Sequence, residues 1–331
     1  MTTFAEPPPS VDTDGTCQSV TEIIYTHFNS YQRDGNTKNV SRAAEALHHD
    51  VLSFVLSNKN NEDAPTEEEV SEEVATAVTR CVDGAMSIIA ASDSKKDTWS
   101  ESVTSILELG AVYATTAGKD ELVARTVINR AIEFLSVEKD TIRTESCNML
   151  GWCVRHLVES SKPAASILKK KGGKHNGGTT NNNNTKRTND AAAGWKLECL
   201  LDIGKALQPR LTDKIAKVRS AAISACVPFF FEGAAVVAGK ESKDFEKMLT
   251  SIQNTLTWIM SNDTSAPNRA LVAQSGLSVS GETTPNVIER VKDVDVKVRE
   301  AALDSLRENV NVDDLTEDQR VEILRYGLTK R

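Results

Sequence analysis

Aromatic residues are scarce in this sequence. Only 5% of its 331 residues are Phe, Trp or Tyr, although 39% are hydrophobic. A core of Ala, Val, Ile and Leu suits packed helices better than a β-sandwich or barrel, where aromatic residues are enriched. Proline is also sparse, with nine in the chain, so long stretches are free to be helical. The composition therefore predicts an all-α protein.

Segments that mark export or membrane insertion are also missing. No apolar run approaches the roughly 18 residues of a membrane span, so no membrane association is expected. The first ten residues, MTTFAEPPPS, lack the basic stretch and apolar run of a signal peptide. The six cysteines form no C-x-x-C pair, and most stand in apolar helical stretches, where a thiol acts as a small hydrophobe. A reducing compartment inside the cell is expected.

Motifs for catalysis are absent as well. The stretch GAAVVAGKES around Lys240 differs from a phosphate-binding loop, because five residues separate its glycines where four are required. Glu241 also replaces the Ser or Thr that would reach magnesium. His48 and His49 are adjacent and so point to different sides of their helix. We predict no catalytic residue, metal, cofactor or small-molecule substrate, and a divergent nucleotide hydrolase built around Lys240 is the enzyme alternative.

Charge is unevenly distributed along the chain. Residues 1–140 carry 11 Lys and Arg against 24 Asp and Glu, a balance of −13. Residues 141–331 carry the remaining 28 and 23, a balance of +5. Attraction to nucleic acid would therefore come from local patches in the second half, not from the field of the whole molecule.

The helical pattern divides the chain into successive parts. Residues 1–16 are predicted to be a disordered leader, and residues 17–160 to form N-terminal helical repeats. Residues 161–194 are rich in Lys, Gly and Asn and poor in large apolar side chains, which predicts a disordered insertion. Residues 195–331 are predicted to be HEAT repeats, in an array that ends abruptly.

An aspartate is followed six residues later by an arginine three times in the second half. The pairs are Asp213 with Arg219, Asp263 with Arg269, and Asp293 with Arg299. A further copy places Arg143 in the same register. Small or apolar residues then recur every four positions, as in Val218, Ala222, Cys226 and Phe230, which predicts one buried stripe per helix. This pattern is typical of the second helix of a HEAT unit, which buries its apolar face only by stacking on neighbours.

The expected fold class is therefore an α-solenoid of irregular HEAT- or armadillo-like repeats. The aligned arginines are 76, 50 and 30 residues apart, whereas a typical unit spans about 40–47 residues. Aspartates and arginines of successive HEAT repeats commonly form a ladder. We therefore predict structural roles in such a ladder for Asp213, Asp263, Arg269, Asp293 and Arg143.

Two groups of basic residues remain as candidates for DNA binding. Lys169, Lys170 and Lys171 lie in the insertion, as either a solvated loop or a nuclear-import signal or phosphate tether. The second group occupies equivalent turns of two repeats: Lys214, Lys217, Arg219, Arg290, Lys292, Lys297 and Arg299. Turns of successive repeats lie along one edge of a solenoid, so these cations could form a stripe that suits a phosphate backbone. The alternative is ordinary surface charge, partly neutralised by neighbouring aspartates.

The end of the chain resembles a known family. In NVIERVKDVDVKVREAALDSLRENVNVDDLTEDQRVEILRYGLTKR, an R-x-x-D-V stretch, a Val-Arg pair, a helix and an L-x4-R-x3-L-x2-G-L pattern follow one another. This order is similar to the N-terminal portion of the condensin complex subunit 3 family. The matching residues are Arg290, Asp293, Val294, Val298, Arg299, Leu315, Arg320, Leu324, Gly327, Leu328 and Arg331. RLTDKIAKVRSAAISAC also looks like a repeat of that family, and the resemblance covers residues 195–331.

The resemblance implies a non-catalytic HEAT-repeat subunit of condensin. Such a subunit binds the kleisin chain and, with it, double-stranded DNA without sequence specificity in mitotic chromosome condensation, while the ATPase belongs to the partner SMC subunits. It implies a place in the nucleus and on chromosomes, with a cytoplasmic pool. It also implies that Val321, Leu324 and Leu328 form an exposed face. The alternative is a generic HEAT-repeat adaptor, of the transport-receptor or phosphatase-scaffold type, that binds only proteins.

Overall fold

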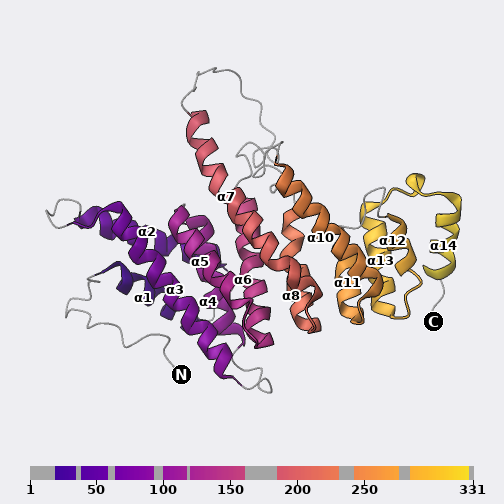
Figure 1. Ribbon diagram of the computed structural model, residues 1–331, viewed down its shortest axis with the longest axis horizontal. Coiled ribbons are helices and arrows are strands. Elements are labelled where there is room, and N and C mark those ends of the chain that lie inside the picture. Colours follow the sequence, from indigo (N-terminus) through magenta and orange to yellow (C-terminus); the bar gives the residue numbers. More distant parts are fainter. Residues whose placement is uncertain are drawn as a thin grey trace. The chain divides into compact units, whose positions relative to one another are not determined.

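The computed structural model confirms the predicted helical fold. It describes residues 19–34, 39–58, 64–92, 100–117, 120–160, 185–230, 242–275 and 284–327. Within these ranges the chain forms helices and turns and no strand. The helices form two compact units, Met1–Ile203 and Gly204–Arg331 (Figure 1).

The first unit is built around two long, buried helices. Its elements are α1 (Val20–Asp34), α2 (Val40–Asn58), α3 (Glu67–Ala91), α4 (Ser100–Val112), the π-helical turn η3 (Tyr113–Ala117), α5 (Glu121–Phe134), α6 (Asp140–Glu159) and most of α7 (Thr185–Leu207). Helix α3 packs on α1, α4 and α5, and α6 packs on α4 and α5. Val78 of α3, Leu107 of α4 and Leu150 of α6 are fully buried. The core is thus aliphatic, as the composition predicted.

Helix α3 begins at a capping box. The Thr66 hydroxyl accepts a hydrogen bond from the Glu69 backbone N–H at 3.2 Å, and the Glu69 carboxylate accepts one from the Thr66 N–H at 2.7 Å. This exchange satisfies two N–H groups that would otherwise lack partners. Of the helices described, α3 alone is long and apolar enough to cross a membrane by length and composition. Half of its most apolar stretch is buried against its neighbours in the unit.

Buried cysteines behave as the sequence predicted. Cys81 of α3 and Cys199 of α7 are 6% and 2% exposed. Burial raises the pKa of the Cys81 thiol to about 12 and that of Cys199 to about 11. Both thiols therefore stay protonated near neutral pH and pack as small apolar groups.

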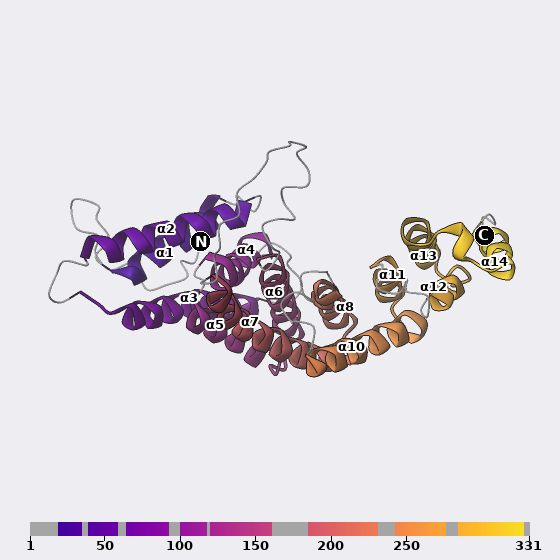
Figure 2. The same ribbon diagram turned by 90° about the horizontal axis from the view of Figure 1, so that it is seen from above.

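The second unit consists of helix pairs in two layers. Its elements after α7 are the 3-10 turn η6 (Gln208–Thr212), α8 (Ala216–Cys226), η7 (Val227–Phe230), α10 (Lys243–Asn262), α11 (Ala266–Gln274), α12 (Thr284–Arg290), α13 (Val296–Asn309), η8 (Val312–Asp314) and α14 (Glu317–Gly327). Helices α8, α11 and α13 pack side by side, while α10 packs on α11 and α12 on α13 (Figure 2). This is the stacking of HEAT pairs.

The predicted buried stripes are present, with one change of register. Val218, Ala222 and Cys226 are fully buried in α8. Phe229 is 1% exposed, whereas Phe230, which the four-residue spacing predicted to be buried, is only partly buried. The prediction was wrong at Phe230 because α8 tightens into the 3-10 turn η7, which has 3.0 residues per turn in place of 3.6.

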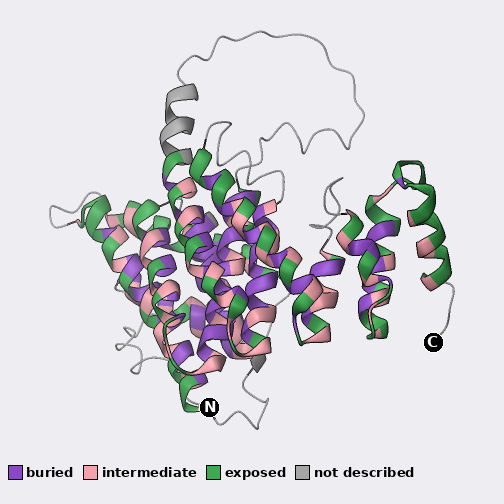
Figure 3. Cartoon of the chain, turned by 45° about the vertical axis from the view of Figure 1, so that its right-hand side comes forward, coloured by how far each residue is buried: buried purple, intermediate pink, exposed green. Residues whose placement is uncertain are grey.

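Helix α14 differs from the other α-helices of the second unit because none of its residues is buried (Figure 3). Val321 and Leu324 are 51% and 58% exposed, which confirms the exposed face predicted for these two residues. Leu328 lies outside the described residues.

Two sequence-based boundaries fall on or near residues that the structure does not describe. The predicted leader, residues 1–16, and residues 161–184 of the predicted insertion, including Lys169, Lys170 and Lys171, lie outside the described ranges. Helix α7 begins at Thr185, within the last ten residues of the predicted insertion. Alanines at positions 191–193 favour helix there even without large apolar side chains.

Candidate functional site

Arg219, near the start of α8, joins two successive repeats of the second unit. Its Nε and Nη2 donate to the two carboxylate oxygens of Asp263 at 2.7 and 2.6 Å. Its Nη1 donates to the carbonyl oxygen of Asp213, six residues earlier, at 2.8 Å. The Arg219 and Asp263 side chains are 12% and 1% exposed. This bidentate, nearly buried pair is a strong charge-assisted contact between repeats.

Arg269 of α11 makes the same set of contacts with the next repeat. Its Nε and Nη2 donate to the Asp293 carboxylate at 2.9 and 2.7 Å, and its Nη1 donates to the Asp263 carbonyl at 2.8 Å. The Arg269 and Asp293 side chains are 11% and 4% exposed. Asp263 therefore accepts from Arg219 through its side chain and from Arg269 through its backbone. These contacts form a continuous ladder, called here the Arg–Asp ladder.

The other aligned arginines share the fold-back on the preceding turn. Arg299 donates from Nη1 to the carbonyl oxygens of Asp293 at 2.9 Å and Val294 at 3.2 Å. In the first unit, Arg143 donates from Nη1 to the Val137 carbonyl at 3.0 Å and to that of Glu138. The arginine thus stabilises the turn that precedes its own helix, a role that the spacing alone did not reveal.

Asn268 is a ladder residue that the sequence analysis missed. It is 1% exposed, and its Nδ2 donates to the Asp263 carboxylate at 3.2 Å and to the Ala216 carbonyl at 3.1 Å. The Ser265 N–H donates to the same carboxylate at 2.7 Å. The signal for this residue in the sequence is an Asn directly before the ladder arginine. Its role could not be predicted from that position, because the Ala216 carbonyl to which it donates lies 52 residues away.

The ladder carboxylates are held in their ionised form. Burial opposes ionisation of Asp263, but hydrogen bonds from Arg219, the Ser265 N–H and Asn268 outweigh it and keep the pKa below its ordinary value. The pKa of Asp293 is lowered in the same way, against burial, by Arg269 and the Asp295 N–H. Both carboxylates are therefore charged at neutral pH.

These pKa shifts predict that the second unit loses stability in acid. A carboxyl whose pKa is lower in the folded than in the unfolded chain stabilises the fold above its unfolded pKa of about 3.9. That contribution is lost as the pH falls from there through the lower folded pKa. Urea unfolding followed by circular dichroism between pH 7 and pH 2 should show this loss. In an Asp263→Asn/Asp293→Asn variant the loss should be smaller, and an unchanged pH profile would contradict the assignment.

Some of the basic side chains predicted to bind DNA are already bound within the chain, and others are exposed to solvent. Arg219 is paired with Asp263 in the Arg–Asp ladder, and Arg299 is bound to carbonyl oxygens of the preceding turn. Arg290 Nη1 lies 3.7 Å from the Asp293 carboxylate and donates to the Ser261 carbonyl. Lys292 pairs with Glu289 at 3.5 Å and with Glu322. The charges of Arg219, Arg290 and Lys292 are balanced by these carboxylates, so the three side chains offer little attraction to an external phosphate.

Lys214, Lys217 and Lys297 are the available cations of this group. All three are exposed, and no ion pair of theirs occurs among the residues that the structure describes. Lys217 and Lys297 stand two residues before Arg219 and Arg299, at equivalent places in their turns. Pro267 occupies that place in the middle repeat, so the positive edge is interrupted there.

No other cluster suggests chemistry in the described part of the chain. Groups of three or more His, Cys, Asp or Glu side chains that could hold a metal ion are absent from it. The Lys240 region lies outside the described residues. The edge of the ladder is therefore the candidate site for a macromolecular partner.

The sequence of this chain is similar to that of a condensin subunit. No family model matches the chain. Condensin complex subunit 3 of Homo sapiens is 32% identical over 129 residues, which is 39% of this chain and 11% of the human protein. The predicted resemblance to condensin complex subunit 3 is confirmed. The matched part spans about a tenth of the length of that relative.

One solved structure agrees on the fold. The S. pombe condensin Cnd3–Cnd2 subcomplex contains a chain with a TM-score of 0.51 and 17% identity, over 95% of this chain and 31% of that chain. This similarity supports the HEAT-repeat architecture and extends no further. An engineered protein has a TM-score of 0.33 and 13% identity, over 78% of this chain and 95% of that one, which is too low to support any argument.

Proposed function

We propose that this chain acts as a non-catalytic HEAT-repeat subunit of a condensin complex. It binds the kleisin subunit, assembles with the SMC subunits that carry the ATPase, and works in the nucleus on mitotic chromosomes. The observation that carries the proposal is the 32% identity to condensin complex subunit 3. The kleisin partner is proposed by analogy with the crystallised condensin subcomplex, in which Cnd3 is bound to Cnd2 and whose similarity to this chain shows the fold alone.

We further propose that the subunit holds double-stranded DNA without sequence preference. The contacts support this because Arg219 and Arg299 are bound to oxygen atoms of the chain itself, while Lys214, Lys217 and Lys297, at or just before the starts of α8 and α13, are exposed. Ammonium groups at intervals suit a phosphate backbone, and no base-reading geometry is needed. Lys169, Lys170 and Lys171 add a second basic tract.

A mobility-shift assay across a salt series tests this function. Two duplexes of unrelated sequence should bind equally, with and without a kleisin segment. The logarithm of the affinity should fall with the logarithm of salt concentration by about 0.9 for each phosphate contact. Absence of binding at low salt, even with the kleisin segment present, would refute DNA binding.

A generic HEAT-repeat adaptor that binds only proteins is the second candidate. Exposed apolar side chains favour the adaptor. Val294 and Val296, which precede Lys297 in the sequence, are 93% and 51% exposed. Exposed valines contribute nothing to phosphate binding but are common in protein interfaces. The adaptor would leave both duplexes unshifted in the salt series.

A further inference from the structure

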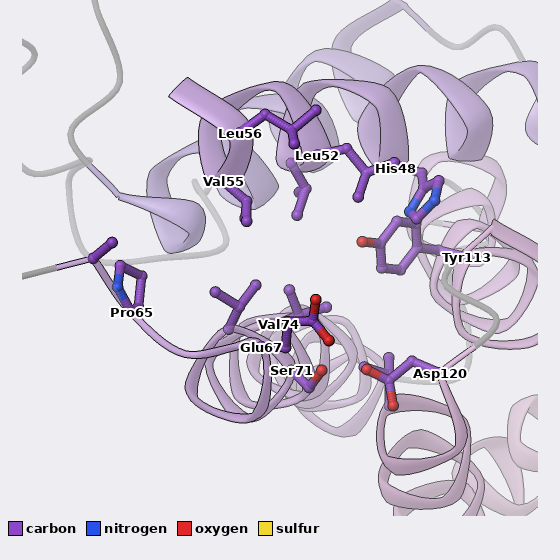
Figure 4. Close-up of a pocket in the computed structure, with 14 residues that line it drawn as sticks. His48, Leu52, Val55, Leu56, Pro65, Glu67, Ser71, Val74, Tyr113 and Asp120 are labelled. Carbon is purple, nitrogen blue, oxygen red and sulfur yellow. The ribbon is translucent and has the colours of Figure 1, made fainter. Parts of the chain in front are cut away.

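A groove in the first unit has no role in the function proposed above. It lies between the second half of α2 and the first two turns of α3, with Pro65 near one end and His48 and Tyr113 at the other (Figure 4). Its volume is about 420 Å³, within the roughly 300–1,000 Å³ typical of ligand sites. The groove is large enough to receive several side chains of a partner.

The walls of the groove are apolar. Leu52 and Leu56, one turn apart on α2, are 46% and 64% exposed. They line the groove together with Val74 of α3, which lies across from α2 (Figure 4). Val70, one turn before Val74, also lines it, and the two valines are 9% and 5% exposed. Helix α2 packs on α1, α4 and η3, and these contacts leave the leucines open to solvent. Adjacent exposed leucines beside a buried floor are typical of a docking surface.

The charge at the groove has one sign. Glu67, at the start of α3, and Asp120, the N-cap of α5, are the carboxylates among its described lining residues, and none of these residues is a Lys or Arg. His48 stands edge-on to Tyr113, with ring centroids 6.5 Å apart. Residues 1–140 as a whole carry a balance of −13. An occupant therefore needs apolar anchors together with positive charge.

We propose that this groove binds a short linear segment of a partner protein. Two or three aliphatic side chains of the segment insert between α2 and α3, and Lys or Arg residues beside them face Glu67 and Asp120. Laying the apolar face of an amphipathic helix into a groove is a recurrent mode of peptide recognition. The proposal goes beyond DNA and kleisin binding and does not depend on either.

Charge also argues against two other occupants. DNA has the same sign as the rim of the groove and is repelled by it. Residues 1–18 of this chain contain Glu6, Asp12 and Asp14 but no Lys or Arg, so they lack the cations that the rim requires. The complementary chemistry is that of a basic, leucine-rich segment.

Fluorescence anisotropy with synthetic peptides tests the proposal on the full chain. The probe is a fluorescein-labelled helical 14-residue peptide with leucines at positions i, i+3 and i+7 and two lysines at each end. Its partner probe has glutamates in place of the lysines. We expect the lysine peptide to bind at least tenfold more tightly, because only its ends complement Glu67 and Asp120.

Matched variants locate the binding. Leu56→Asp should weaken binding of the lysine peptide at least tenfold, while circular dichroism stays unchanged because Leu56 is largely exposed. Leu324→Asp is the control, since Leu324 is 58% exposed on α14 of the second unit, and it should bind as the parent does. A Glu67→Gln/Asp120→Asn variant should bring the two peptides to similar affinity, because Asn preserves the helix cap.

Three results would overturn the proposal. Equal affinity of the parent for the two peptides would show that Glu67 and Asp120 do not attract the segment. Parental affinity in Leu56→Asp would place the peptide elsewhere. Tighter binding after replacement of Lys169, Lys170 and Lys171 by alanine would show that the basic tract of the chain itself occupies the groove. None of these results bears on the DNA mobility shift, so the two proposals fail independently.

Discussion

Replacement of Asp263 by alanine should destabilise the second unit by about 3–5 kcal/mol, the usual loss when one partner of a buried ion pair is removed. The change leaves Arg219 nearly buried without its carboxylate, and it also removes the acceptor of Asn268 and of the Ser265 N–H. Urea unfolding followed by circular dichroism measures the loss. Because total stability of a domain is only about 5–15 kcal/mol, this loss is a large share of it, and the unit should unfold at a clearly lower urea concentration than the parent.

The matched control is Asp304→Ala on α13. Asp304 pairs with Arg307 at 3.1 Å, but the two side chains are 52% and 71% exposed, so the loss should stay within about 1 kcal/mol. Arg219→Met supplies the reciprocal change, since it keeps the aliphatic stem and leaves the Asp263 carboxylate unpaired. Equal effects of Asp263→Ala and Asp304→Ala would show that the Arg–Asp ladder does not hold the repeats together.

Charge reversal at Lys217 and Lys297 should lower DNA affinity at least tenfold at low salt. The loss should be equal for all duplexes, because phosphate contacts carry no sequence information. The salt slope should also fall by about 0.9 for each contact removed. Mobility shifts of the Lys217→Glu/Lys297→Glu variant on two unrelated duplexes measure both quantities.

Lys243→Glu/Lys247→Glu is the control for this experiment. It changes the net charge by the same amount at the start of α10, about 24–30 Å along the helix from Asp263 at a rise of 1.5 Å per residue. We expect near-parental affinity. A similar loss in both variants would assign binding to the field of the whole molecule. An unchanged shift in Lys217→Glu/Lys297→Glu would identify these lysines as ordinary surface charge and favour the adaptor.

The structure explains why a ladder mutation should change stability, whereas a lysine mutation should change DNA binding. Sequence spacing placed Arg219 and Lys217 in one basic cluster, because both lie in the same turn. The ladder separates them, since the guanidinium of Arg219 is bound on both edges and Lys217 is exposed. A mutation at Arg219 therefore acts on stability, and a mutation at Lys217 acts on the surface charge.

The sequence predicted well those features that depend on residues close together in the chain. The four-residue recurrence of Val218, Ala222 and Cys226 identified a buried helix face, because the period of an α-helix is a property of the backbone alone. It failed at Phe230, where the helix narrows to a 3-10 turn. The groove escaped prediction because its walls come from three stretches, 48–56, 64–74 and 113–123.

The sequence by itself determined that this protein is helical, that its second half repeats a HEAT-like unit, and that it resembles condensin complex subunit 3. These conclusions rest on composition, periodicity and short motifs, which are local. Only the tertiary structure decided that Arg219 bonds to Asp263, 44 residues away, that Lys214, Lys217 and Lys297 remain exposed, and that an acidic groove opens beside Leu56. Stacking of the helices decides these points, since it sets which side chains come within hydrogen-bonding distance and which stay in water.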